Sequence, residues 1–137
     1  MVSHSDVLHL AKNLSNSYPL IVDKISKATG VAHESAGTLL NETIKYLFLV
    51  GHSRSRLTPS IQVDLAWHEF ILFTKVYEEF CMHHFGHFIH HHPGESDRNN
   101  QMQFVRTLEY YKEYFGTPDP RFWGNRVTSC GSCEGGV

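Results

Sequence analysis

Residues Thr58 to Gly86 read TPSIQVDLAWHEFILFTKVYEEFCMHHFG, and the predicted fold depends on this stretch. Thr58 suits an N-cap, Pro59 suits the first helical turn, and Gly86 suits the residue after a helix. Between them, a stripe with the spacing of a buried helical face is formed by Trp67, Phe70, Ile71, Thr74, Tyr77 and Cys81. Trp67 and Tyr77 would each need a partner for a polar tip. The stretch therefore predicts one long central helix.

Four further segments carry helical spacing or helix-end signals, and nothing in the chain alternates like a strand. The segments are Ser5–Leu14 with Ser5 as its cap, Pro19–Gly30, Ala32–Gly51 and Ser96–Gly116. We therefore expect an all-α fold, a compact single-domain bundle of about five helices over residues 1–125. The Pro- and Gly-rich C-terminal stretch is expected to run over the surface, with a flexible Gly/Cys-containing tail at 126–137.

The composition excludes several classes of protein. A net charge of −2 over 137 residues gives no sign of nucleic-acid binding. The apolar run Tyr46–Val50 is far too short to cross a membrane, and the N-terminus lacks the features of a signal peptide. An odd number of cysteines, 3, favours reduced thiols and a location in the cytoplasm. A protein partner or a homo-oligomer is compatible with the sequence.

The second half of the long stretch and its continuation are rich in histidine. Seven of the 11 histidines are His68, His83, His84, His87, His90, His91 and His92. Asp64 and His68 are four residues apart, so a helix would place both side chains on one face, as metal ligands require. The alternative is that Asp64 only orients His68, or that both belong to a polar surface.

Cys81, His90 and His91 are the other candidate metal ligands. Thiolate, imidazole and carboxylate together suit zinc best, and iron or copper also accept such donors. A buried Cys81 is alternatively a small apolar side chain. In a straight helix, His68 would lie about 25 Å from the helix end, whereas the six residues up to His91 reach about 20 Å. One site with His68 and His91 is therefore marginal unless the helix kinks.

The stretch also resembles a known family. The segments VDLAWH, ILFTKVYEEFC and FGHFIHHHP are similar to the signature of plant glycine-rich domain proteins and their short bacterial relatives. Relatives often carry a further histidine where this chain has Phe70. The family has no assigned biochemical function, so the resemblance implies chiefly a helical fold. Among the polar residues it gives most weight to Asp64, His68, His90 and His91.

Three functions are compatible with these observations. The first is a small helical protein that binds a transition metal, zinc in first place, with a structural or regulatory role. The second is a protein-interaction module whose Asp and His cluster is a hydrogen-bonded lock between helix and loop. The third is a metal-dependent enzyme with a general base such as Glu69 or Glu79. The tail motif Cys130-Gly-Ser-Cys133 is a single Cys pair, short of a structural zinc ribbon.

Overall fold

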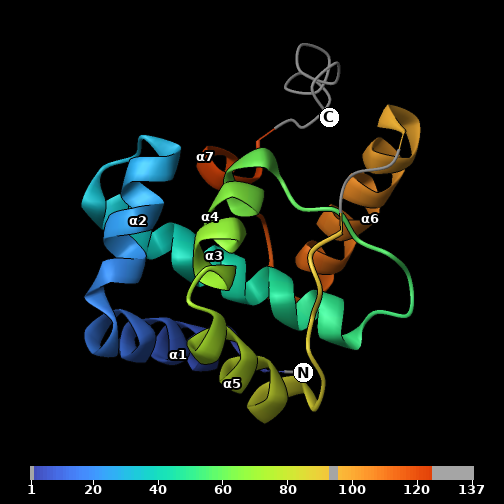
Figure 1. Cartoon of the computed structure of the whole chain (residues 1–137). Coiled ribbons are helices and arrows are strands. Elements are labelled where there is room, and N and C mark those ends of the chain that lie inside the picture. Colours follow the sequence, from blue (N-terminus) through green and yellow to red (C-terminus); the bar gives the residue numbers. More distant parts are fainter. Residues whose placement is uncertain (1, 93–95, 125–137) are drawn as a thin grey trace.

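The fold is built around one buried helix, α3 (His33–His52). The computed structural model describes residues 2–92 and 96–124, and Figure 1 shows α3 running through the middle of the molecule. Helices α1, α2, α4 and α6 all contact it. Every residue from 41 to 49 is buried, so α3 is enclosed on all sides over more than two turns.

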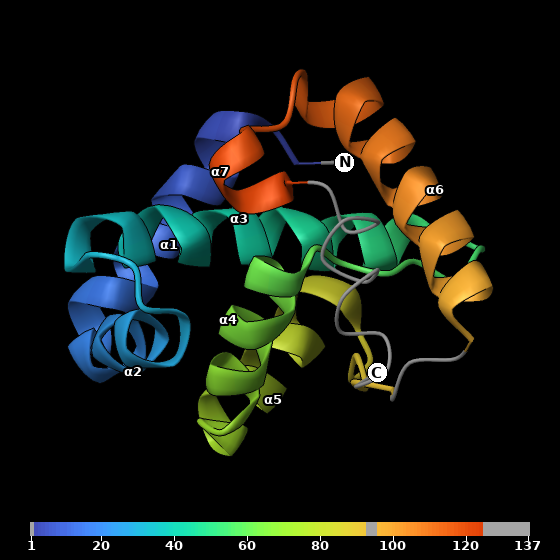
Figure 2. The ribbon, with the colours of Figure 1, turned by 90° about the horizontal axis from the view of Figure 1, so that it is seen from above.

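Helices α1 (His4–Ser17) and α2 (Pro19–Thr29) cover one end of α3 (Figure 2). The predicted ends of α2 are correct, since Pro19 begins it and Gly30 ends it at φ 77°. The predicted cap of α1, Ser5, is wrong. Ser3 is the N-cap instead, because its hydroxyl accepts from the Asp6 N–H while the Asp6 carboxylate accepts from the Ser3 N–H.

The predicted long helix is two helices, α4 (Ile61–Ile71) and α5 (Thr74–Phe85). The cap of α4 is Ser60 rather than Thr58. Neither Pro nor Gly marks the break, so we attribute it to packing. Two side chains that a straight helix would hold about 15 Å apart, Trp67 and Tyr77, are hydrogen-bonded at 3.0 Å, which requires the chain to bend between them.

The C-terminal part of the described chain packs more deeply than the sequence indicates. Helix α6 (Asp97–Phe115) begins after Ser96 and ends before Gly116, as predicted. The stretch expected to run over the surface instead forms the short helix α7 (Pro120–Trp123), which buries Phe122 and Trp123. Residues 125–137, including the predicted tail with Cys130 and Cys133, lie outside the described residues.

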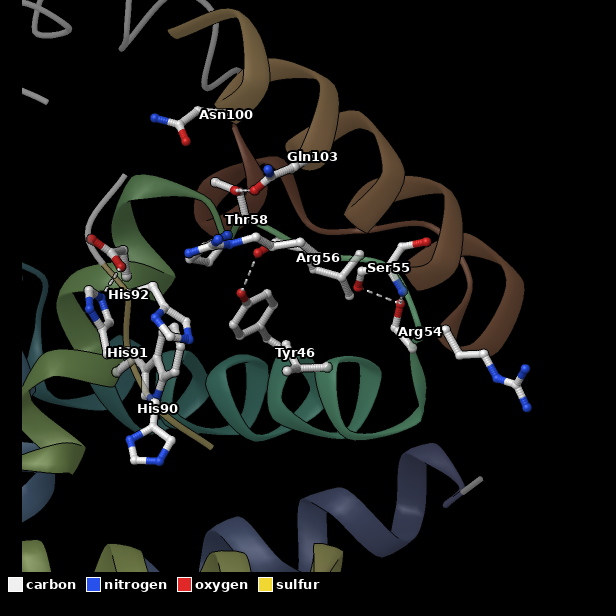
Figure 3. A pocket seen from close by; sticks show the side chains of 16 residues that line it. Tyr46, Arg54, Ser55, Arg56, Thr58, His90, His91, His92, Asn100 and Gln103 are labelled. Carbon is white, nitrogen blue, oxygen red and sulfur yellow. Dashed lines mark hydrogen bonds and ion pairs between the residues drawn. The ribbon is translucent and has the colours of Figure 1, made fainter. Parts of the chain in front are cut away.

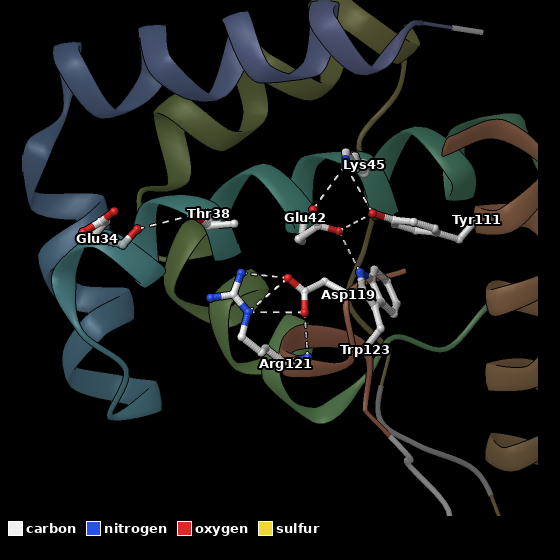
Figure 4. Close-up of polar contacts among 8 residues, drawn as sticks. All are labelled: Glu34, Thr38, Glu42, Lys45, Tyr111, Asp119, Arg121 and Trp123. Atoms are coloured by element: carbon white, nitrogen blue, oxygen red, sulfur yellow. Dashed lines mark hydrogen bonds and ion pairs between the residues drawn. The ribbon is translucent and has the colours of Figure 1, made fainter. Parts of the chain in front are cut away.

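A buried ion pair on α3 is hydrogen-bonded to side chains of α6 and α7, and nothing in the sequence pattern indicated it. Lys45 and Glu42 are 2% and 5% exposed, and the Lys45 ammonium donates to the Glu42 carboxylate at 3.2 Å. The same carboxylate accepts from the Tyr111 hydroxyl at 2.5 Å and from the Trp123 indole N–H at 2.8 Å (Figure 4). The Lys45 ammonium also donates to the Tyr111 oxygen at 3.2 Å. We call these four residues the buried network.

The predicted fold class is confirmed: the regular elements of the described residues are all helices, seven in number. The count exceeds the expected five because the long stretch divides and because α7 forms. Among residues 2–92 and 96–124, no helix has the length and hydropathy needed to span a bilayer.

Candidate metal site and adjoining pocket

The first two residues of the candidate site come from α4. Asp64 and His68 lie one helical turn apart on the same face, as their spacing predicted. The opposite side of this helix is apolar and fixes its rotation, because Val63, Ala66 and Phe70 are buried in the core. The polar face is thereby directed away from the core, with His68 exposed and the Asp64 side chain 30% exposed.

The third residue, His91, comes from the segment after α5. Gly86, at φ 76°, ends α5 and lets the chain turn back. Two hydrogen bonds then hold this segment against α4: the Trp67 indole N–H donates to the Tyr77 hydroxyl at 3.0 Å, and that hydroxyl donates to the Ile89 carbonyl at 2.6 Å. His91 lies two residues after Ile89. Because the chain bends between α4 and α5, His91 comes close to His68, which a straight helix would have made difficult.

Asp64, His68 and His91 form a compact cluster, which we call the polar cluster. One donor atom from each lies within 4.8 Å of the other two. His91 Nε2 is 2.8 Å from Asp64 Oδ1. The His68 and His91 rings are tilted by 31° with centroids 4.1 Å apart, and the centroid of the buried Trp67 ring lies 4.6 Å from that of His91. The cluster therefore presents one carboxylate and two imidazoles in a single small volume.

The structure does not bring the other two predicted ligands, Cys81 and His90, into this cluster. Cys81 is fully buried, and burial raises the pKa of its thiol, which also contacts Tyr77 and the Ile89 backbone. The thiolate needed for metal binding is therefore disfavoured there, and Cys81 fits the alternative of a small core residue. His90 is exposed and its ring lies 4.7 Å from Phe88. It lines a pocket beside the cluster together with His91, but its donor atoms are not among the three that converge.

Three of the other histidines of the stretch lie on or just after α5, and the fourth, His92, lines the same pocket beside the cluster. The His84 ring lies 4.5 Å from the Phe80 ring, and burial lowers its pKa. His87 Nδ1 is 3.1 Å from the Phe85 carbonyl oxygen, near the turn at the end of α5. His83 is exposed on α5. These positions explain why a histidine-rich sequence yields a cluster with only two imidazoles among the described residues.

A pocket of about 350 Å³ adjoins the polar cluster, and Asp64 and His91 form part of its wall (Figure 3). The opposite wall is the link between α3 and α4, residues 53–59, together with the start of α6. Buried hydrogen bonds fix this link: the Tyr46 hydroxyl donates to the Leu57 carbonyl at 3.2 Å, and the Thr107 hydroxyl donates to the Thr58 carbonyl at 2.8 Å. The pocket is thus framed by anchored backbone.

The sequence pattern did not predict this pocket. Its two arginines, Arg54 and Arg56, stand among serines in the run HSRSRL, and this composition is the only signal that could have drawn attention to it. The wall depends on contacts between residues 45 to 50 positions apart, which no local pattern reports.

The comparison with protein families settles the classification. The UCP032817-like family matches residues 13–111 of the chain, a span that includes α2 to α5, most of α6 and the whole polar cluster. The chain belongs to the UCP032817-like family. This is an uncharacterised family, so membership assigns no activity.

The family assignment corrects the resemblance drawn from the sequence. Nothing indicates a glycine-rich domain family, so that family's signature gives no support to any residue of the polar cluster. Neither a curated protein nor a solved structure matches this UCP032817-like chain. The case for the cluster consequently rests on its own geometry.

Proposed function

We propose that this UCP032817-like protein binds one divalent transition-metal ion through Asp64, His68 and His91. The observation that supports the proposal is the convergence of three donor atoms within 4.8 Å of one another from two separate segments. One carboxylate and two imidazoles suit zinc in first place, and iron and copper accept the same donors.

Binding requires only a small local adjustment. In a tetrahedral zinc site with bonds of about 2.0–2.1 Å, neighbouring donors lie about 3.3 Å apart. His68 is exposed and can turn toward the other two residues without disturbing the core. The 2.8 Å contact between His91 Nε2 and Asp64 Oδ1 is held by a hydrogen between these atoms, and a metal ion would take its place while that hydrogen moves to His91 Nδ1 or to solvent.

Three protein donors leave at least one coordination position of the ion unfilled. Closed structural zinc sites use four protein ligands, whereas sites that bind water or a ligand use three. Asp64 and His91 also line the pocket, so an open coordination position would be adjacent to a space that can hold a ligand. We therefore propose a ligand-binding metal centre rather than a purely structural one.

The test is elemental analysis of untagged protein after dialysis against buffered zinc, iron or copper, with His68→Ala alongside. We expect about one equivalent of metal in the wild type and strong loss in the variant. His83→Ala is the matched control, because His83 is exposed on α5, outside the polar cluster, and should leave the metal content unchanged. Equal metal content in the wild type and His68→Ala would refute the proposal.

The hydrogen bond between His91 and Asp64 favours a second candidate, the architectural lock of an interaction module. On that view the 2.8 Å contact only fastens residues 87–92 to α4, and function depends on a protein partner or a second copy. A lock predicts the same melting temperature with and without a chelator, whereas a metal centre predicts a decrease when the ion is removed. A location in the cytoplasm, with reduced thiols, is part of both proposals.

A further inference from the structure

The pocket beside the polar cluster carries an excess of positive charge. Among the described residues that line it, Arg54 and Arg56 are positive and Asp64 is the sole acidic residue. The lining therefore holds two arginines and one carboxylate, and a divalent ion on Asp64 would add further positive charge. A partly enclosed space with this balance favours an anionic ligand.

The two arginines differ in direction. In Figure 3 the Arg56 side chain extends across the pocket toward the wall that carries His91 and His92, whereas Arg54 points away from it. The backbone at Arg56 is held by Arg106, whose guanidinium donates to the Arg56 carbonyl at 3.3 Å. Arg56 also interacts within the chain, so a bound anion would share its guanidinium with that partner. Arg56 is therefore the arginine placed to meet a ligand at the metal.

A neutral donor on α6 complements this charge. Gln103 lines the pocket, and its amide oxygen accepts from the Thr58 hydroxyl at 2.7 Å. With the oxygen engaged, the group that Gln103 can offer a ligand is its NH₂, which donates two hydrogen bonds and suits an anionic oxygen. The Thr58 backbone N–H in turn donates to Thr107, which fixes the position of this pair.

We propose, on the basis of the proposed metal centre, that the pocket binds a small molecule carrying a phosphoryl group. A terminal phosphoryl group offers three oxygens to the donors around the pocket, which are Arg56, Gln103 and the metal ion, whereas a carboxylate offers two. The volume of about 350 Å³ lies within the range of small-molecule sites, about 300–1,000 Å³, so an organic part attached to the phosphoryl group has room as well.

The test uses inorganic phosphate as the probe, titrated calorimetrically into protein loaded with one equivalent of zinc and freed of excess metal. We expect saturable binding in the wild type and binding at least about tenfold weaker in Arg56→Met, because a charge-assisted contact is lost. Arg54→Met is the matched control, since Arg54 points away from the cluster, and it should retain nearly the wild-type affinity. Both variants should hold as much zinc as the wild type.

The outcomes separate this proposal from the metal centre itself. Normal zinc content with no phosphate binding, or with equal binding in Arg56→Met, would overturn the phosphoryl site and leave the metal proposal standing. Malonate binding more tightly than phosphate would overturn the choice of ligand. Equal phosphate binding with and without zinc would overturn the contact to the metal. Absence of zinc from the wild type would instead refute the proposed function.

Discussion

The polar groups of this protein gather in two regions that differ in exposure and in connection. The buried network of Glu42, Lys45, Tyr111 and Trp123 is closed, because every strong donor and acceptor in it meets another member. The polar cluster on α4 is open: His68 is exposed, and the cluster borders a pocket. A closed network has nothing left to offer a ligand, so its effect is on stability.

The difference has a physical origin in desolvation. Removing charges from water is costly, and a buried pair is tolerated only when hydrogen bonds satisfy both partners. The partly exposed pair of Asp64 and His91 avoids part of that cost and can exchange partners with an incoming ion. We therefore expect substitutions in the buried network to change stability and those in the polar cluster to change metal binding.

The largest effect should come from Glu42→Gln in the buried network. The variant leaves the Lys45 ammonium buried without a counter-charge, which typically costs about 3–5 kcal/mol of unfolding free energy. Urea denaturation measures this loss. Glu34→Gln, an exposed glutamate on the same helix (Figure 4), is the control and should unfold like the wild type. A loss as small as that of the control would show that the pair is not coupled to folding.

Tyr77→Phe should affect both properties, because Tyr77 links α4 to the segment that carries His91. The variant leaves the Trp67 N–H and the Ile89 carbonyl without their partner in the core, at a cost of about 1–3 kcal/mol. We also expect weaker zinc binding, since the position of His91 depends on this contact. Denaturation and zinc titration give the two readouts, with the exposed Tyr114→Phe as control. Unchanged zinc affinity would mean that His91 is positioned independently of Tyr77.

Alkaline pH should sharpen the comparison, because one buried phenol, Tyr111, belongs to the buried network and another, Tyr77, supports the segment that carries His91. Burial raises the pKa of Tyr77 and of Tyr111 above the ordinary value of about 10. The folded state thus favours the neutral phenols. Their contribution to stability is complete below about pH 10 and is lost as the pH rises above it, where the unfolded chain ionises first.

Urea denaturation between pH 8 and 11 measures this loss. Tyr111→Phe and Tyr77→Phe should each flatten the decline above pH 10, whereas the exposed Tyr114→Phe should not. If the decline is equally steep in all three variants, other groups cause it.

The smallest effect on metal binding is expected for Cys81→Ala. The thiol lies in the core between Tyr77 and Ile89, away from the polar cluster, so zinc content should equal that of the wild type. Stability should decrease by about 1 kcal/mol, an ordinary cost for a core substitution. Loss of zinc in this variant would return Cys81 to the ligand set.

Local chemistry in the sequence determined the helical class and several helix ends. Pro19, Gly30, Ser96 and Gly116 act within one turn of their own positions, through a fixed φ, a left-handed conformation or a side-chain cap. The same holds for the alignment of Asp64 with His68, because four-residue spacing on a helix needs no further information.

Tertiary contacts decided the rest. The division between α4 and α5, the return of His91 to α4, the burial of Lys45 and the docking of Trp123 all depend on residues brought together from distant positions. Trp123 and Glu42, for example, meet across 81 positions of the chain. No residue near the break, near His91 or near Lys45 carries a local signal for these outcomes, since each follows from satisfying buried polar groups and filling the core. The sequence by itself named two members of the polar cluster as a spaced pair, and only the folded chain selected the third.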